Sequence, residues 1–227
     1  MQIKNILKDR ILHGVYPIQT NIPSEPQLEE EFQVSKITVR NAIKELVKDG
    51  YLETKSGKGT KVIRNTSISR LSKGKRFTEV LVEKGHIIQK RLLGAETIEN
   101  APETTLYTLF GEQCIRIERL YYLDNEPYIH YTHYLTMQRM EGIELTHLNA
   151  QSLYDLIEEQ DISLEKFRDQ FAVAKADSYV GERLNMQAGE ALLKRSRYSY
   201  DEEGNIIEYS EGYYNTEMQQ YIVNYDI

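Results

Sequence analysis

The 227-residue sequence has no tryptophan and a single cysteine, Cys114. One thiol excludes an internal disulfide and suits the reducing cytoplasm, where we expect the protein to be located. The neighbouring residues Ile115 and Ile117 indicate a buried structural thiol rather than a catalytic one. No apolar run approaches the length of a membrane span, and the first residues do not resemble a secretory signal. We therefore expect no association with a membrane.

The motifs of the common metal and nucleotide sites are also missing. The sequence contains neither a CxxC nor an HExxH motif, and it has no nucleotide-binding glycine motif. His130 and His133 are three residues apart on a predicted strand, so they should point to opposite faces and make a poor metal pair. No pair of carboxylates marks a catalytic site. We expect no metal, no cofactor and no enzymatic activity.

Charge of the two signs is separated along the chain. The net charge is −7, but residues 1–76 hold 15 Lys and Arg against 8 Asp and Glu, a net +7. Residues 77–227 hold 13 against 27, a net −14. This asymmetry favours a basic head that binds nucleic acid, attached to an acidic body.

An amphipathic basic helix is predicted from Ser35, its N-cap, to about Lys48, with Gly50 just after its end. Apolar residues at helical spacing form one face that should be buried: Val39, Ala42, Ile43, Leu46 and Val47. The other face carries no acidic residue, and it consists of Lys36, Ile37, Arg40, Asn41, Lys44 and Lys48. A helix of this kind can lie along a DNA duplex.

Short elements flank this helix on both sides. Ser24 and Gln27 predict a capping box for a preceding helix, and only residues 33–34 separate the two helices, as in a helix-turn-helix. Two short strands are predicted after it, over 51–54 and 60–63. The turn that joins them is basic and rich in glycine, so this hairpin, a wing, can approach a phosphate backbone closely.

Several segments of this region resemble the winged helix-turn-helix of the GntR family of bacterial transcription regulators: Pro23-Ser24-Glu25, Val34-Ser35-Lys36-Ile37-Thr38-Val39-Arg40, Asp49-Gly50-Tyr51-Leu52 and Gly57-Lys58-Gly59-Thr60. The resemblance implies operator contacts by Ser35, Lys36, Thr38 and Arg40, and entry of Gly57 into the minor groove. Asn41, Lys44 and Lys58 join these candidates because they lie on the basic face and on the wing. The family commonly has Arg where this chain has Pro26 and Lys36. The first difference removes a DNA contact, and the second replaces a bidentate donor with a point charge.

The domain organisation follows from these patterns. A first helix, ended by Gly14, completes a head over residues 1–64. Residues 65–76 form a linker that is rich in Ser, Lys and Arg, and either a phosphate-touching tether or a solvated hinge explains its composition. Residues 77–227 form the body.

The body is predicted to be α+β, with a mainly antiparallel sheet and helices to one side. Helices are predicted over 77–84, 101–110, 152–160 and 177–184. Strands are predicted over 86–96, 113–123, 127–135, 163–175, 191–200 and 205–214. Four segments resemble the UTRA effector-binding domain of the HutC-type branch of the GntR family: Arg119-Leu120-Tyr121, Asp124-Asn125-Glu126-Pro127, Ser152-Leu153-Tyr154 and Gly204-Asn205-Ile206-Ile207-Glu208-Tyr209-Ser210. That resemblance implies a fold shared with chorismate lyase.

A small-molecule site is predicted on the sheet, because strand residues two apart share a face. Polar and aromatic side chains of this kind suit a sugar or a sugar phosphate. The candidates are Arg119, Tyr121, Tyr131, Ser152, Glu208, Ser210 and Tyr214. In the sugar-phosphate members of the branch, the resemblance implies an anion clamp of two arginines and a serine. Here Arg119 and Ser152 are present, but Tyr121 takes the place of the second arginine.

Three hypotheses remain open. The chain is a ligand-controlled regulator, most simply a repressor of a carbohydrate operon, that binds a palindromic operator as a homodimer and leaves it when the effector binds. Alternatively, it is a chorismate-lyase-like enzyme with a DNA-binding head. As a third alternative, it is a DNA-binding dimer without an effector.

Overall fold

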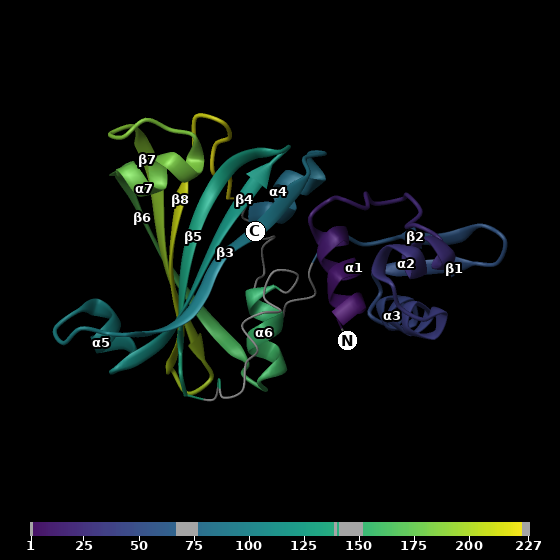
Figure 1. Ribbon diagram of the computed structural model, residues 1–227, viewed down its shortest axis with the longest axis horizontal. Coiled ribbons are helices and arrows are strands. Elements are labelled where there is room, and N and C mark those ends of the chain that lie inside the picture. Colours follow the sequence, from purple (N-terminus) through teal and green to yellow (C-terminus); the bar gives the residue numbers. More distant parts are fainter. Residues whose placement is uncertain (1, 67–76, 139, 141–151, 224–227) are drawn as a thin grey trace. The chain divides into compact units, whose positions relative to one another are not determined.

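The computed structural model describes residues 2–66, 77–138, 140 and 152–223 (Figure 1). Its contacts divide the chain into two compact units, between Ile88 and Gln89. Most of the predicted linker, from residue 67 to residue 76, lies outside the described residues, so its role stays a prediction. Among the described residues, no helix is long and apolar enough to cross a membrane.

The first unit begins with three helices and a two-stranded hairpin: α1 (Gln2–Leu12), α2 (Glu25–Phe32), α3 (Lys36–Lys48), β1 (Leu52–Lys55) and β2 (Gly59–Val62). The helix starts carry the predicted caps. The Gln27 side chain accepts a hydrogen bond from the backbone N–H of Ser24 at 2.9 Å. Ser35 Oγ accepts one from the backbone N–H of Thr38 at 3.3 Å. Each cap satisfies a backbone donor that has no partner within the helix.

One apolar core joins these elements. Leu28 of α2 and Val39 and Leu46 of α3 are completely buried, together with residues of α1 and the hairpin. Burial of each such side chain stabilises the fold by roughly 1.5–3 kcal/mol. Val47 was expected in this core, but it is 38% exposed. It lies about 80° around the helix from Val39, at the edge of the apolar stripe, where the core does not reach.

Helix α4 (Phe77–Glu83) also belongs to the first unit. The backbone N–H of Ile88 donates to the carbonyl of His13 at 2.9 Å, which ties the segment after α4 to the end of α1. Gly14 makes this approach possible, because its φ is +80° and a Cβ there would lie 2.9 Å from the carbonyl oxygen of His86. The two compact units therefore meet after Ile88, whereas the sequence places the start of the body at Phe77. The start of the functional domain at Phe77 stays a prediction.

A six-stranded sheet with the strand order β3-β4-β5-β8-β7-β6 forms the second unit. Its strands are β3 (Ile88–Glu99), β4 (Gln113–Leu123), β5 (Glu126–Thr136), β6 (Leu164–Lys175), β7 (Ala191–Asp201) and β8 (Ile206–Tyr214). Its helices are α5 (Thr105–Phe110), α6 (Leu153–Glu159) and α7 (Ser178–Leu184). The prediction of an α+β protein with an antiparallel sheet is confirmed. The hairpin β4–β5 turns through Asp124 and Asn125, both with positive φ, as a two-residue turn requires.

The strand register gives the sheet two faces. Glu118 and Thr132 are partners on one face, and Arg119 and Tyr131 are partners on the other. We name these the Glu118 face and the Arg119 face. Helix α7 packs its apolar side chains on the Glu118 face, whereas α6 contacts the Arg119 face through Tyr154. Helices thus contact both faces, where the sequence had suggested one.

Candidate nucleic-acid interface and effector site

The polar face of α3 is open to solvent. Its predicted DNA-contacting residues are all exposed, namely Ser35, Lys36, Thr38, Arg40, Asn41 and Lys44. Ile37 lies among them and is 71% exposed. A duplex can therefore reach this face in the first unit, although the individual DNA contacts stay predictions.

Arg40 is held at the start of α2 by Glu25. Arg40 Nη2 lies 2.8 Å from Glu25 Oε2, and Arg40 Nε lies 3.2 Å from Glu25 Oε1. The hydrogen bonds from Arg40 lower the pKa of the Glu25 carboxyl. A bidentate pair fixes the plane of the guanidinium, so a DNA phosphate must compete with Glu25 for it. Glu25 belongs to the Pro23-Ser24-Glu25 motif, but the sequence alone gave it no role.

The wing is a short hairpin in which Lys55 is the register partner of Gly59. Gly57, in the turn, has a φ of +72°, and a Cβ there would have no neighbour within 4 Å. Glycine is therefore favoured at position 57 by the backbone conformation and not by packing within the unit. Lys58 follows it and is exposed.

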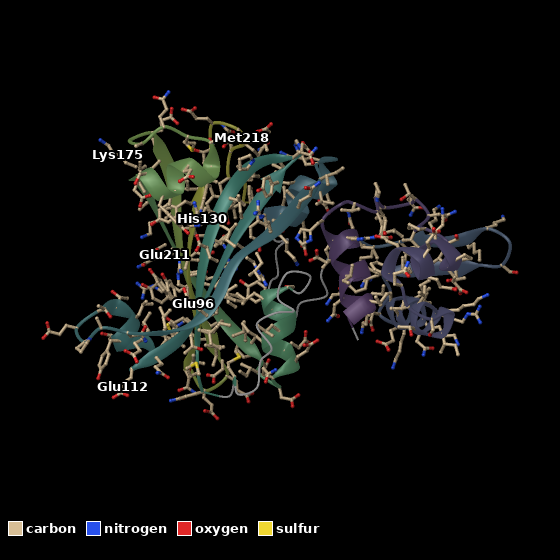
Figure 2. All side chains as sticks on the ribbon, viewed as in Figure 1. Glu96, Glu112, His130, Lys175, Glu211 and Met218 are labelled. Atoms are coloured by element: carbon tan, nitrogen blue, oxygen red, sulfur yellow. The ribbon has the colours of Figure 1, made fainter. Side chains whose placement is uncertain are left out.

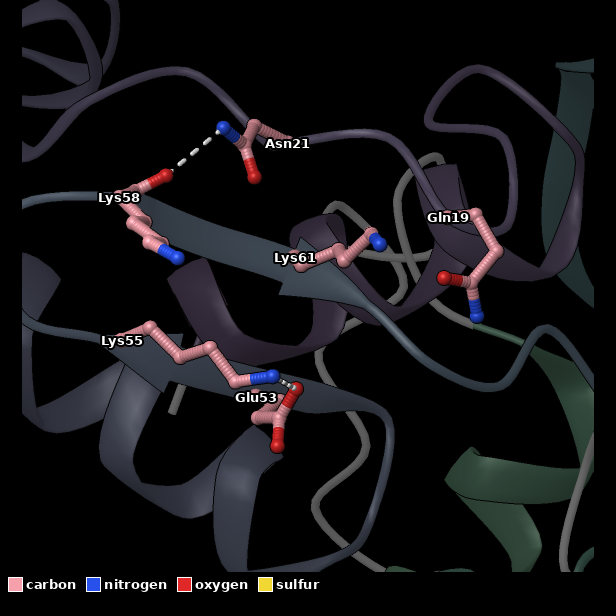
Figure 3. A pocket seen from close by; sticks show the side chains of 7 residues that line it. Gln19, Asn21, Glu53, Lys55, Lys58 and Lys61 are labelled. Atoms are coloured by element: carbon pink, nitrogen blue, oxygen red, sulfur yellow. Dashed lines mark hydrogen bonds and ion pairs between the residues drawn. The ribbon is translucent and has the colours of Figure 1, made fainter.

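A basic hollow of about 410 Å³ lies beside the wing (Figure 3). Its lining residues are Gln19, Asn21, Glu53, Lys55, Lys58, Gly59 and Lys61. The Lys55 ammonium is 3.0 Å from the Glu53 carboxylate, and Asn21 Nδ2 donates to the carbonyl of Lys58 at 3.0 Å. Three lysines against one glutamate leave the hollow positive, which suits contact with a phosphate backbone.

In the second unit, the strand register brings most of the predicted effector residues together on the Arg119 face. The ring centroid of Tyr121 lies 5.8 Å from that of Tyr131, and the hydroxyls of Tyr131 and Tyr214 are in contact. Arg119, Tyr131, Ser210 and Tyr214 are buried, and Tyr121 is half-buried. Ser152 is the N-cap of α6, the helix that contacts this face through Tyr154.

Glu208 is completely buried, and both of its oxygens are engaged within the protein. His133 Nδ1 lies 3.0 Å from Glu208 Oε1, and Ser199 Oγ donates to Glu208 Oε2. Burial lowers the pKa of His133 more than Glu208 raises it. Burial also opposes ionisation of Glu208, but the hydrogen bonds from His133, Ser199 and Ser210 outweigh it and lower its pKa. A neutral His133 therefore donates to an ionised Glu208, which orients the imidazole.

Two residues of this face were missed in the sequence, Arg195 and Arg197 of β7. Arg197 makes a bidentate pair with Asp169, with both distances at 2.7 Å, and it donates to the Tyr154 hydroxyl at 3.0 Å. Arg195 is 9% exposed and donates to the Tyr221 hydroxyl at 2.7 Å. The sequence shows two arginines at strand spacing. It does not show the strand register that places Arg195 beside Tyr131.

The Glu118 face carries a separate buried cluster. Glu118 accepts hydrogen bonds from His130 Nε2 at 2.7 Å, from Arg116 Nη2 at 2.8 Å and from the Tyr179 hydroxyl. Burial lowers the pKa of His130. His130, labelled in Figure 2, and His133 lie on opposite faces as predicted, and Arg116 faces away from Arg119.

Comparison with known proteins identifies the class to which these features belong. Residues 1–62 match the family described as bacterial regulatory proteins, gntR family, and residues 83–220 match the UTRA domain. The chain therefore belongs to the GntR family of bacterial transcription regulators, in the branch with a C-terminal UTRA domain. It is a DNA-binding regulator rather than an enzyme, which removes the lyase hypothesis.

Individual relatives match over nearly the whole chain. The chain is 28% identical over 214 residues to the probable fructoselysine utilization operon transcriptional repressor of Escherichia coli O157:H7, covering 92% of this chain and 87% of that protein. It is 24% identical over 224 residues to the transcriptional repressor NagR of Bacillus subtilis, covering 97% and 92%. The crystal structure of PhnF from Mycobacterium smegmatis has a TM-score of 0.58 and 26% identity, covering 94% of each chain.

Proposed function

We propose that this regulator is a homodimeric repressor that binds a palindromic operator and is released by a sugar or sugar-phosphate effector. Helix α3 lies in the major groove, and the wing contacts the adjacent backbone. The effector binds the Arg119 face and favours the arrangement of the two heads that does not fit the operator.

The observation that carries the proposal is the contrast between the two sides of α3. Val39 and Leu46 are completely buried in the core, whereas the opposite side presents an exposed row of basic and polar groups that includes Lys36 and Lys44. The helix is thus rigidly held with its DNA-facing side free. Ile37 adds an exposed apolar group that suits contact with a thymine methyl.

The effector part of the proposal is supported by the chemistry of the Arg119 face and by the relatives. The buried Arg195 lies beside Tyr131 and Tyr214, and together they offer positive charge and aromatic surface to a polar ring compound. NagR, PhnF of Mycolicibacterium smegmatis and the fructoselysine relative are described as transcriptional repressors. The operon named for the last of these points to a sugar derivative as the first compound to test.

The small size of one head supports the proposed dimer. A single helix and wing contact only one half-site, and a two-fold dimer matches the two halves of a palindrome.

Fluorescence anisotropy with DNA from the promoter of the protein's own gene region tests the proposal. Arg40→Ala should weaken binding, and the control Arg168→Ala, which removes an exposed arginine of β6, should not. Equal affinity of Arg40→Ala and the native protein would refute the role of α3. Fructoselysine, a hexose phosphate and inorganic phosphate are then added to the complex, because the third hypothesis predicts that no metabolite releases the DNA.

A further inference from the structure

Arg195 lies in an aromatic cage on the Arg119 face. Its guanidinium carbon is 5.5 Å from the ring centroid of Tyr131, 5.8 Å from that of Tyr214 and 5.9 Å from that of Tyr221. Only 9% of the residue is exposed. Among the described residues, Arg195 donates to the Tyr221 hydroxyl, while its Nε–H is buried without a hydrogen-bond partner.

Among the described residues of this face, no carboxylate is bonded to the guanidinium of Arg195. Both carboxylates of this face are bonded to other groups: Glu208 to His133 and Ser199, and Asp169 to Arg197. Both oxygens of Asp169 are bonded to Arg197. Burial raises the pKa of Asp169, but the hydrogen bonds and charge of Arg197, followed by the charge of Arg195, outweigh it and lower that pKa. The charge of Arg195 is therefore left without a bonded counter-ion among the described residues.

An arginine cannot remove this charge by losing its proton, because its pKa is far above neutrality. The three aromatic rings around Arg195 stabilise its guanidinium only in part. The Tyr221 hydroxyl is uncharged, so it does not neutralise the guanidinium. A buried cation without a counter-ion is costly, so its retention calls for an anion that binds there. A singly charged group neutralises this charge, whereas a phosphate dianion would reverse its sign.

A second unsatisfied group lies nearby on the same face. His133 stacks on Tyr131, with the ring centroids 5.0 Å apart, and its Nε2 is buried without a hydrogen-bond partner among the described residues. Because Nδ1–H donates to Glu208, Nε2 carries the lone pair and accepts a hydrogen bond. The face therefore offers a cation for an anionic oxygen and an acceptor for a hydroxyl or an amine.

We propose that Arg195 binds a carboxylate of the effector and that His133 Nε2 accepts a hydrogen bond from a hydroxyl or amine on the same ligand. This inference rests on the proposed effector function and narrows its ligand to a sugar derivative that carries a carboxylate, such as a sugar acid or a conjugate of a sugar with an amino acid. The carboxylate takes the place of the Tyr221 hydroxyl on Arg195.

The first experiment compares the thermal unfolding of Arg195→Met and Arg197→Met, two neighbouring arginines of the same strand and face. Arg197→Met leaves the partly exposed Asp169 without its partner and should lower Tm by about 3–6 °C. Arg195→Met removes an uncompensated cation and should leave Tm unchanged or raise it. A loss in Arg195→Met as large as that in Arg197→Met would show that Arg195 has an internal counter-ion, and would overturn the proposal.

The second experiment measures Tm of the full chain in sodium acetate and in acetamide, a neutral molecule of the same shape, with chloride added to equalise ionic strength. Acetate near its dissociation constant should raise Tm by about 1–2 °C more than acetamide does. This difference should vanish in Arg195→Met and persist in Arg116→Met, the control on the Glu118 face. Equal shifts by acetate and acetamide in the native protein, or an acetate shift that survives Arg195→Met, would refute the carboxylate site. Neither measurement uses DNA, so such a failure leaves the operator-binding proposal intact.

Discussion

Acidification from pH 7.5 to pH 5.5 should destabilise this protein, because its two sheet histidines are buried in the neutral form. Burial lowers the pKa of both His130 and His133 from the ordinary value of 6.5. As pH falls through 6.5, the unfolded chain takes up protons that the folded chain does not, so stability is lost. The lowered pKa values of Glu118 and Glu208 act in the same direction below their ordinary value of 4.5.

The magnitude follows from proton linkage. A histidine that stays neutral in the folded state lowers the unfolding free energy by about 1.4 kcal/mol per pH unit below its unfolded pKa. Two such histidines give a loss of at most about 3 kcal/mol between pH 7.5 and pH 5.5, and less where the folded pKa lies within this range. That is a large share of the roughly 5–15 kcal/mol that stabilises a typical protein.

Urea unfolding at the two pH values measures this loss. The control is a double variant, His130→Gln and His133→Asn, in which each amide nitrogen replaces the ring nitrogen that contacts the carboxylate. The variant should lose most of the pH dependence, whatever its stability at pH 7.5. Native protein that is equally or more stable at pH 5.5 would show that the histidines are protonated partners of Glu118 and Glu208. That result would refute the neutral form assigned to His133 on the Arg119 face.

Three further predictions concern the head. Arg40→Ala should reduce the slope of log affinity against log salt by about 2 for a dimer, if each head loses one phosphate contact. Glu25→Gln should strengthen operator binding, because it releases Arg40. An unchanged slope and affinity in both variants would contradict a contact between Arg40 and DNA. Ser35→Ala should cost about 1 kcal/mol in urea unfolding through loss of the N-cap, and a cost near zero would show that the cap contributes nothing. Leu46→Ala should cost about 2–5 kcal/mol, whereas the exposed Val47→Ala should cost under about 0.5 kcal/mol; similar costs would contradict the placement of Val47 at the edge of the core.

Local signals in the sequence were sufficient for most of the fold. Ser24, Gln27 and Ser35 cap helices because their side chains satisfy backbone donors a few residues away, which a sequence shows directly. The turn at Asp124 and Asn125 follows from the same kind of short-range chemistry. Helical periodicity correctly placed the buried residues of α3 except Val47. Val47 lies at the edge of the apolar face, where periodicity alone does not show how far the core extends.

The Arg119 face was predicted only in part, because its composition depends on strand register. Arg119 and Tyr121 could be assigned to one face within a single strand. Placing Arg195 beside Tyr131 requires β8 between β5 and β7, with Gly212 as the register partner of both residues. A register shift also occurs between Ser199 and Tyr200, and alternation along the strand cannot reveal it. The pairing of Arg40 with Glu25 was missed for a similar reason, since it joins two helices.

Lysine modification with and without operator DNA tests the central claim, that the polar face of α3 and the wing bind the duplex. At a DNA concentration that saturates the anisotropy signal, Lys36, Lys44 and Lys58 should become protected, while Lys166 and Lys175 of β6 should react at their original rates. Unchanged modification of Lys36 and Lys44 in the saturated complex would contradict the account.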